Sequence, residues 1–182
     1  MLVIVVTAEV GAFSRVISCS LPWRPPSWGS FSLSIDDAVT LSRGFASCGG
    51  VVHDEEGTVW VAWAIAAEGE FSVEVAELLA LRVGLQWADS LGYIMSVSET
   101  DSVCVCNWVN SPSSIFLFRP IIIEIVSLLA AVGGGSCRTI SRNANGVANT
   151  LAKFVTSSIG VNVWTDTYSK FISAPVTVDL VR

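Results

Sequence analysis

A long amphipathic segment, residues 72–91, constrains most strongly what this chain can fold into. The segment follows three strand-like stretches and precedes a fourth, and its apolar residues recur with the period of an α-helix. Ser72 is the expected N-cap, and the helix is expected to end near Gly92. A helix of this length between two strands acts as a crossover, after which the next strand runs parallel to an earlier one. The sequence therefore predicts an α/β fold built on a mixed sheet.

Glu77 lies inside the apolar stripe of this helix. With about 100° of rotation per residue, Leu81 and Gly84 fall on the same side as Glu77, whereas Arg82 and Gln86 fall on the opposite side. An ionised carboxylate among small apolar groups costs several kcal/mol unless it is paired or binds a metal. We therefore expect a partner from elsewhere in the chain, either a buried arginine or a metal site.

The segments around the helix predict five strands and three further helices. Residues 31–37 alternate between apolar and polar side chains, and the turn at 54–57 joins two more strand-like stretches into a hairpin. The three strands before the helix therefore form an antiparallel meander. The other predicted elements are strands at 45–53, 58–67, 93–100 and 137–142 and helices at 102–110, 120–132 and 145–156.

Carboxylates stand at the ends of two of these strands. Asp36 ends the first strand and Asp101 follows the fourth, and parallel pairing of the two strands would place them side by side, within reach of Glu77. Oxygen ligands of this kind suit Mg²⁺ or Mn²⁺. Two such ions can activate a water and stabilise the leaving oxygen of a phosphodiester. The alternatives are that Asp36 and Asp37 form a strand-ending turn and that Asp101 caps the next helix.

Six short motifs occur in order between residues 23 and 153 and resemble those of the ribonuclease H type 1 family, in particular its plant-type reverse-transcriptase-like domain. They are WRPP, IDDA, GGVVHDEEG, AEL, ETDS and RNANGVANTLAK. The resemblance implies a ribonuclease H-like fold, with a five-stranded mixed sheet of three antiparallel strands and then parallel additions, and helices on both faces. It also implies Mg²⁺ or Mn²⁺ as the cofactor and an RNA/DNA hybrid as the partner. The catalytic and metal-binding residues that it implies are Asp36, Glu77, Asp101 and Asn149.

The chain departs from the family pattern at four positions. Asn149 replaces the fourth carboxylate, Asp37 a glycine, Asn143 a glutamate and Thr139 a frequent histidine. An asparagine oxygen can bind a cation but brings no charge. Three functions therefore stay open: a ribonuclease that cuts the RNA strand of RNA/DNA hybrids by two-metal hydrolysis, a catalytically impaired nucleic-acid-binding module, and a retroelement-derived remnant of the same fold.

Composition limits the partners and the compartment. The net charge is -6, which argues against a broad electrostatic footprint for nucleic acid, so such binding would need a local basic rim. The five cysteines are odd in number and form no CxxC pair, which is typical of reduced thiols in an intracellular protein. No apolar run reaches the roughly 18 residues of a membrane span. We expect a soluble chain without a membrane partner, and a monomer.

The predicted organisation is one folded domain with extensions at both ends. Residues 1–22 form an N-terminal extension, which we do not interpret as a signal peptide because it begins without positive charge and carries Glu9 in its apolar run. A linker rich in Pro and Trp covers 23–30, the ribonuclease H-like domain covers 31–158, and a C-terminal tail covers 159–182.

Overall fold

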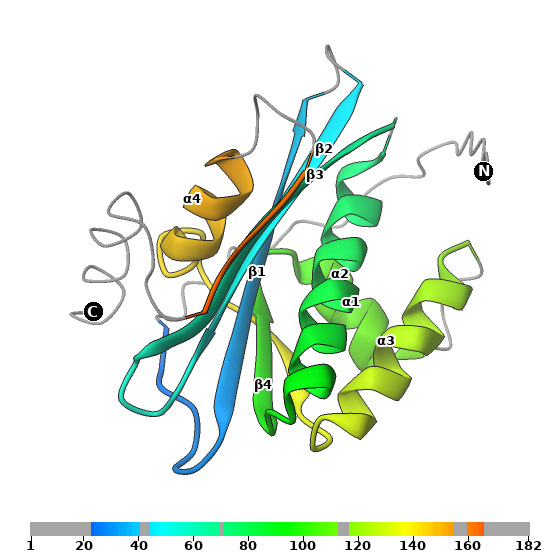
Figure 1. Ribbon diagram of the computed structural model, residues 1–182. Helices are drawn as coiled ribbons and strands as arrows, with labels where there is room; N and C mark the ends of the chain where they lie inside the picture. The colour runs from blue at the N-terminus through cyan, green and yellow to red at the C-terminus, as the bar shows by residue number, and fades with distance from the viewer. Residues whose placement is uncertain (1–22, 41–43, 70, 113–116, 155–159, 166–182) are drawn as a thin grey trace.

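Helices cover both faces of a single mixed sheet (Figure 1). The computed structural model describes residues 23–40, 44–69, 71–112, 117–154 and 160–165, so the predicted N-terminal extension and the tail beyond 165 lie outside the described residues. One face carries α4 (Gly146–Phe154). The other carries α1 (Val73–Leu91), α2 (Val103–Asn110) and α3 (Arg119–Ala131). No helix in the described ranges is long and apolar enough to cross a membrane.

The described part of the sheet has six strands in the order β5-β4-β1-β2-β3-β6. β1 pairs antiparallel with β2 and parallel with β4, and β5 adds parallel to β4, which confirms the predicted mixed sheet. The strands are β1 (Phe31–Thr40), β2 (Phe45–His53), β3 (Val59–Glu68), β4 (Met95–Thr100), β5 (Ser136–Thr139) and β6 (Gly160–Trp164).

The prediction of five strands was wrong by one, because β6 pairs antiparallel with β3 inside the segment assigned to the tail. The exposure of its valine and asparagine side chains is the reverse of what their polarity suggests. Val161 and Val163 are exposed, whereas Asn162 lies on the more sheltered side. A strand is recognised from apolar residues on its buried face, so this segment gives no such pattern in the sequence.

Helix α1 begins and ends where its sequence predicts. The Ser72 hydroxyl accepts a hydrogen bond from the Val75 N–H, and Gly92 closes the helix in the left-handed conformation with φ 71°. Toward the sheet, Gly84 packs closely on Leu33 and Trp63. This close approach holds α1 against β1 and places Glu77, two turns before Gly84, near the carboxyl end of that strand.

Helix α4 rests directly on β2 at Gly49. A Cβ added to Gly49 would lie 2.3 Å from the Ala152 backbone nitrogen, and the Ser47 hydroxyl donates to the Ala152 carbonyl at 2.6 Å. Gly49 is the cross-strand partner of Asp36 in β1. The missing side chain at Gly49 therefore lets α4 approach the strand that carries Asp36.

Replacement of Gly49 by alanine is expected to lower the free energy of unfolding by about 1–3 kcal/mol, because helix backbone blocks the new methyl group. Urea unfolding measures the loss. Gly84→Ala is the matched comparison, since its methyl would meet only side-chain atoms, those of Leu33 and Trp63 at 2.9 Å, and alanine favours a helix by about 1 kcal/mol. An unchanged stability of Gly49→Ala would show that α4 is not seated on Gly49.

His53 ends β2 and is buried, although the sequence suggests only a turn residue. Its ring lies 5.4 Å from the ring of Trp23, so a residue of the predicted linker packs on the domain. Burial lowers the pKa of His53 to about 4. The imidazole is therefore neutral at pH 7.

Candidate metal centre

Asp36 and Asp37 are neighbours in β1, and their side chains point to opposite faces of the sheet because successive strand residues alternate. Asp36 shares the α4 face with its partner Gly49. Asp37 shares the α1 face with Ile35, which belongs to the core packed against α1. β1 lies between β2 and β4, so both carboxyl groups are buried, with Asp36 1% and Asp37 8% exposed.

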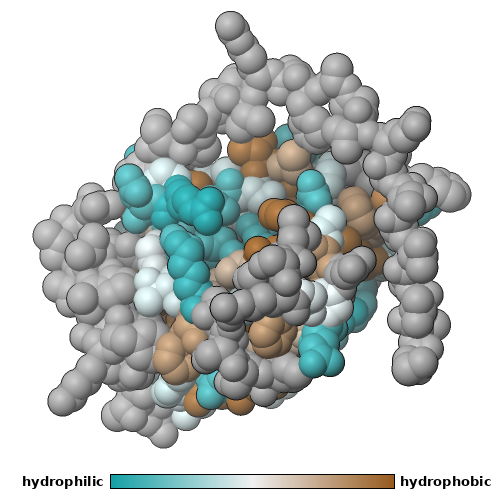
Figure 2. Space-filling view, turned by 90° about the horizontal axis from the view of Figure 1, so that it is seen from above, coloured by the Kyte–Doolittle hydropathy of each residue, from teal (hydrophilic) through white to brown (hydrophobic). Residues whose placement is uncertain are grey.

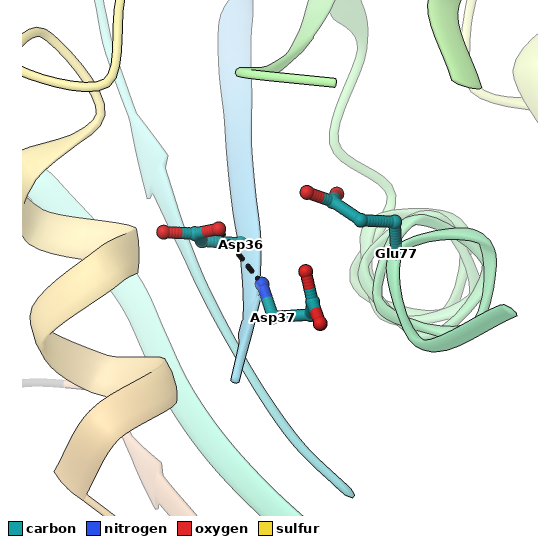
Figure 3. Close-up of side chains that lie close together, drawn as sticks. All are labelled: Asp36, Asp37 and Glu77. Atoms are coloured by element: carbon teal, nitrogen blue, oxygen red, sulfur yellow. Dashed lines mark hydrogen bonds between the residues drawn. The ribbon is translucent and has the colours of Figure 1, made fainter. Parts of the chain in front are cut away.

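Glu77 approaches this pair from α1 and is 2% exposed. The Thr100 hydroxyl, at the end of β4, donates a hydrogen bond to Glu77 Oε2 at 2.9 Å. One oxygen from each of Asp36, Asp37 and Glu77 lies within 4.8 Å of the others, as Figure 3 illustrates. The partner expected for Glu77 is therefore a set of carboxyl groups and a hydroxyl, and the alternative of a buried arginine was wrong.

Asp101 lies beside this group but is not one of the three within 4.8 Å among the described residues. Its Oδ2 lies 3.8 Å from Arg142 Nε, and its negative charge raises the pKa of Asp36. The alternative that Asp101 caps α2 was wrong, since the capping side chain is that of Ser102, which accepts from the Val105 N–H. Asp101 thus acts on the centre through its charge.

Asn149 belongs to α4, which packs against β1. Its neighbour one turn earlier, Asn145, donates from Nδ2 to the Ile35 carbonyl at 2.8 Å and ties α4 to the residue before Asp36. Within the described ranges, Asn149 Oδ1 and Asp36 Oδ2 are buried atoms without a hydrogen-bond partner. Figure 3 shows one oxygen of Asp36 directed toward α4. Neither oxygen can donate when Asp36 is ionised, so a cation or a water is needed to satisfy them.

The donor set suits a divalent cation. Carboxylate and amide oxygens are the ligands that Mg²⁺ and Mn²⁺ prefer. Asp36 Oδ2 and Asn149 Oδ1 are buried acceptors that no donor satisfies in the described residues, and a cation would satisfy them. The residues present therefore fit the cation that the sequence predicts.

Burial and mutual repulsion act together on the acidic groups. Burial, followed by the charge of Asp101, raises the pKa of Asp36 to about 7 and that of Asp37 to about 6. Burial, followed by the charges of Asp36 and Asp37, holds the pKa of Glu77 well above its usual range. Without a cation these groups therefore share protons near neutral pH, and a bound cation would offset their repulsion.

A basic group at the rim of the centre acts on its carboxyl groups. The Arg142 side chain is 65% exposed beside Asp101, and its charge lowers the pKa of both Asp36 and Asp37. Figure 2, which views the molecule from above, shows hydrophilic surface gathered next to apolar patches. Arg142 therefore brings positive charge to the rim of the acidic centre.

Asp37 is the residue that sequence reasoning missed as a site residue, since we took it as a departure from the family glycine or as part of a strand-ending turn. One feature of the sequence could have found it. In the alternation of β1, Asp37 shares the phase of Leu33 and Ile35, which is the buried, apolar phase. A second carboxylate in that phase has the same anomaly as Glu77 and faces the same helix.

A mixed sheet in this order, with helices on both faces and carboxyl groups gathered around its central strand, defines a ribonuclease H-like fold. Solved structures share it. RNase H1 from the halophilic archaeon Halobacterium salinarum is 20% identical, with a TM-score of 0.62, over 69% of this chain and 96% of that one. The N-terminal RNase H domain of a Mycobacterium tuberculosis protein is 22% identical, with a TM-score of 0.60, over 68% and 91%.

LC11-RNase H1, solved in complex with an RNA/DNA hybrid, is 19% identical, with a TM-score of 0.60, over 67% of this chain and 93% of that one. No curated protein sequence matches this one. Residues 35–155 match the family described as reverse transcriptase-like. The chain belongs to that family.

Proposed function

We propose that this protein is a metal-dependent endonuclease of the ribonuclease H type, which cleaves the RNA strand of RNA/DNA hybrids. The observation that carries the proposal is the meeting of Asp36, Asp37 and Glu77 oxygens within 4.8 Å in a chain of this family. The orphaned oxygens of Asp36 and Asn149 add support for a cation there. The LC11-RNase H1 complex supports the class of substrate.

In this proposal Asp36, Glu77, Asp101 and Asn149 hold two divalent cations, Mg²⁺ or Mn²⁺. When bound, the cations supply positive charge that lowers the pKa of the attacking water and stabilises the leaving oxygen. Thr100 orients the Glu77 carboxyl group through its hydrogen bond. Asn149 brings no charge, so the position on the α4 side binds its cation more weakly.

The protein's own groups also bear on recognition of the hybrid. Arg142, exposed at the rim, can meet a phosphate next to the acidic centre. A hybrid helix is recognised through its backbone shape and its 2′-hydroxyl groups rather than through base sequence. We therefore expect cleavage that depends on the RNA strand and only weakly on its sequence.

The test is incubation of the protein with an end-labelled RNA/DNA hybrid and Mg²⁺ or Mn²⁺. The RNA strand should be cut to products with 3′-hydroxyl and 5′-phosphate ends, and the DNA strand should stay intact. A DNA duplex of the same sequence serves as the control substrate, and a chelator should stop the reaction. An intact RNA strand with both metals would contradict the enzymatic proposal.

One observation favours a second candidate, a catalytically impaired nucleic-acid-binding module, because Asn149 replaces a charged ligand. Asn149→Asp discriminates between the two. If the parent binds the hybrid without cutting it and the variant cuts, the second candidate is supported. A parent that neither binds nor cuts would instead indicate a retroelement-derived remnant of the fold.

A further inference from the structure

We propose that Asp37 is an additional cation ligand, which supplies from β1 the negative charge that Asn149 does not supply from α4. This inference rests on the proposed cation site but not on cleavage. With Asp37, the acidic groups around the centre again number four: Asp36, Asp37, Glu77 and Asp101. The charge is kept but lies on the other face of the sheet.

The placement of Asp37 agrees with a ligand and not with a turn. β1 continues past Asp37 to Thr40, and Asp37 pairs in register with Cys48 of β2. The carboxyl group is therefore fixed by a regular, central strand. In Figure 3 it lies on the same side of β1 as Glu77, between that residue and the strand.

A hydrogen bond with the Glu77 side chain partly offsets the charge of Asp37, but among the described residues no basic side chain forms an ion pair with it. The positive charge that acts on it is that of Arg142, which is largely exposed and lies beside Asp101. A buried carboxylate without a close counter-ion is costly. A separate observation indicates that the neighbouring carboxyl group also lacks a ligand: Asp36 is 1% exposed, and its Oδ2, on the α4 side of β1, has no hydrogen-bond partner within the part of the chain that the structure describes.

The two proposed cation positions then differ in their affinity for the ion. One oxygen each of Asp36, Asp37 and Glu77 lies within 4.8 Å of the others, whereas from α4 Asn149 offers only a neutral amide oxygen. Affinity for a hard cation rises with the number of charged oxygen ligands. We infer one tight position between β1 and α1 and one weak position between β1 and α4.

The test is Mn²⁺ binding at pH 7.5 without nucleic acid. Binding is measured by electron paramagnetic resonance of free Mn²⁺ and by calorimetry. Asp37→Asn is expected to weaken the tight position by at least about tenfold, the lower range for loss of a group that supports a metal site. The double variant Asp37→Asn with Asn149→Asp moves the negative charge from β1 to α4, and it is expected to restore binding to within about threefold of the parent.

Glu74→Gln is the matched control. Glu74 lies in the first turn of α1 and its charge acts on Asp37, but it is not one of the three groups within 4.8 Å in the described residues. The inference is overturned if Asp37→Asn binds Mn²⁺ as the parent does, or loses no more affinity than Glu74→Gln.

Thermal melting without cation separates loss of a ligand from loss of fold. Asp37→Asn removes a buried charge and keeps the size of the side chain, so its Tm should match or exceed that of the parent. A parent that binds no Mn²⁺ would overturn this inference and the cation site of the proposed function together. A parent that binds, with an unaffected Asp37→Asn, would overturn only the role of Asp37.

Discussion

Glu77→Gln is expected to lower the rate of hybrid cleavage at least about a hundredfold, the upper range for losing a group that supports a metal site. The substitution removes the charge but keeps an oxygen that can accept the Thr100 hydrogen bond. The apo protein should be as stable as the parent or more stable at pH 7.5, because burial and neighbouring charges oppose ionisation of Glu77. Single-turnover cleavage and thermal melting measure the two effects.

Glu124→Gln is the control for this variant. Glu124 makes a partly exposed pair with Arg82 at 3.4 Å, and pairs of this kind contribute little to stability. It should cleave at the rate of the parent. Unchanged cleavage by Glu77→Gln would exclude Glu77 from the active site, and a collapse of its melting temperature would show that Glu77 mainly supports the fold.

The apo protein is expected to lose stability as the pH rises from about 4 to about 7. Asp36 has a pKa of about 7 in the folded protein against 3.8 in the unfolded reference, and the pKa of Asp37 is raised to about 6. The folded state therefore binds more protons than the unfolded state in this range, and the free energy of unfolding falls with pH. Asp36 alone accounts for up to about 4 kcal/mol, since one pKa unit corresponds to about 1.4 kcal/mol.

His53 has the opposite effect on the pH dependence of stability, because its pKa of about 4 in the folded protein lies below the unfolded value of 6.5. Its contribution to stability is present above pH 6.5 and is lost as the pH falls toward 4. The response to a cation separates the two effects, since His53 is not part of the acidic group. Mg²⁺ or Mn²⁺ should raise the Tm strongly at pH 8 and little at pH 5.

Asp36→Asn is the control for the pH experiment. It should flatten the fall in stability between pH 4 and pH 7 and remove most of the cation response at pH 8. The other charges that act on Asp36, those of Asp101, Asp37 and Arg142, stay in place in this variant. A cation response of equal size at pH 5 and pH 8 in the parent would contradict the assignment of the site to these carboxyl groups.

Local sequence patterns predicted the parts of the fold that depend on local chemistry. The caps of α1 at Ser72 and Gly92 and the parallel pairing of β1 with β4 followed from capping preferences and from the crossover rule. The position of Glu77 in the apolar stripe indicated that a polar site must meet α1. The prediction held because burial of a charge is costly wherever it occurs.

The parts that escaped prediction depend on tertiary context. β6 pairs with β3 through backbone hydrogen bonds while its two valines face outward, so its alternation does not mark a buried apolar face. Trp60, which we would place in the core from its apolar surroundings, is exposed and donates to Asp54 Oδ2 at 2.7 Å. The proximity of Asp37 to Glu77 depends on which face of β1 meets α1. These facts are set by packing between distant segments.

Asp36 and Asp37 share one peptide unit but face different layers of the molecule, with α4 over the first and α1 over the second. Cations held on both sides of this unit would tie the two helical layers together through a single strand. The centre would then act as a reversible cross-link within the fold. Removing the ions would loosen the packing of α4 on the sheet as well as stop the proposed cleavage.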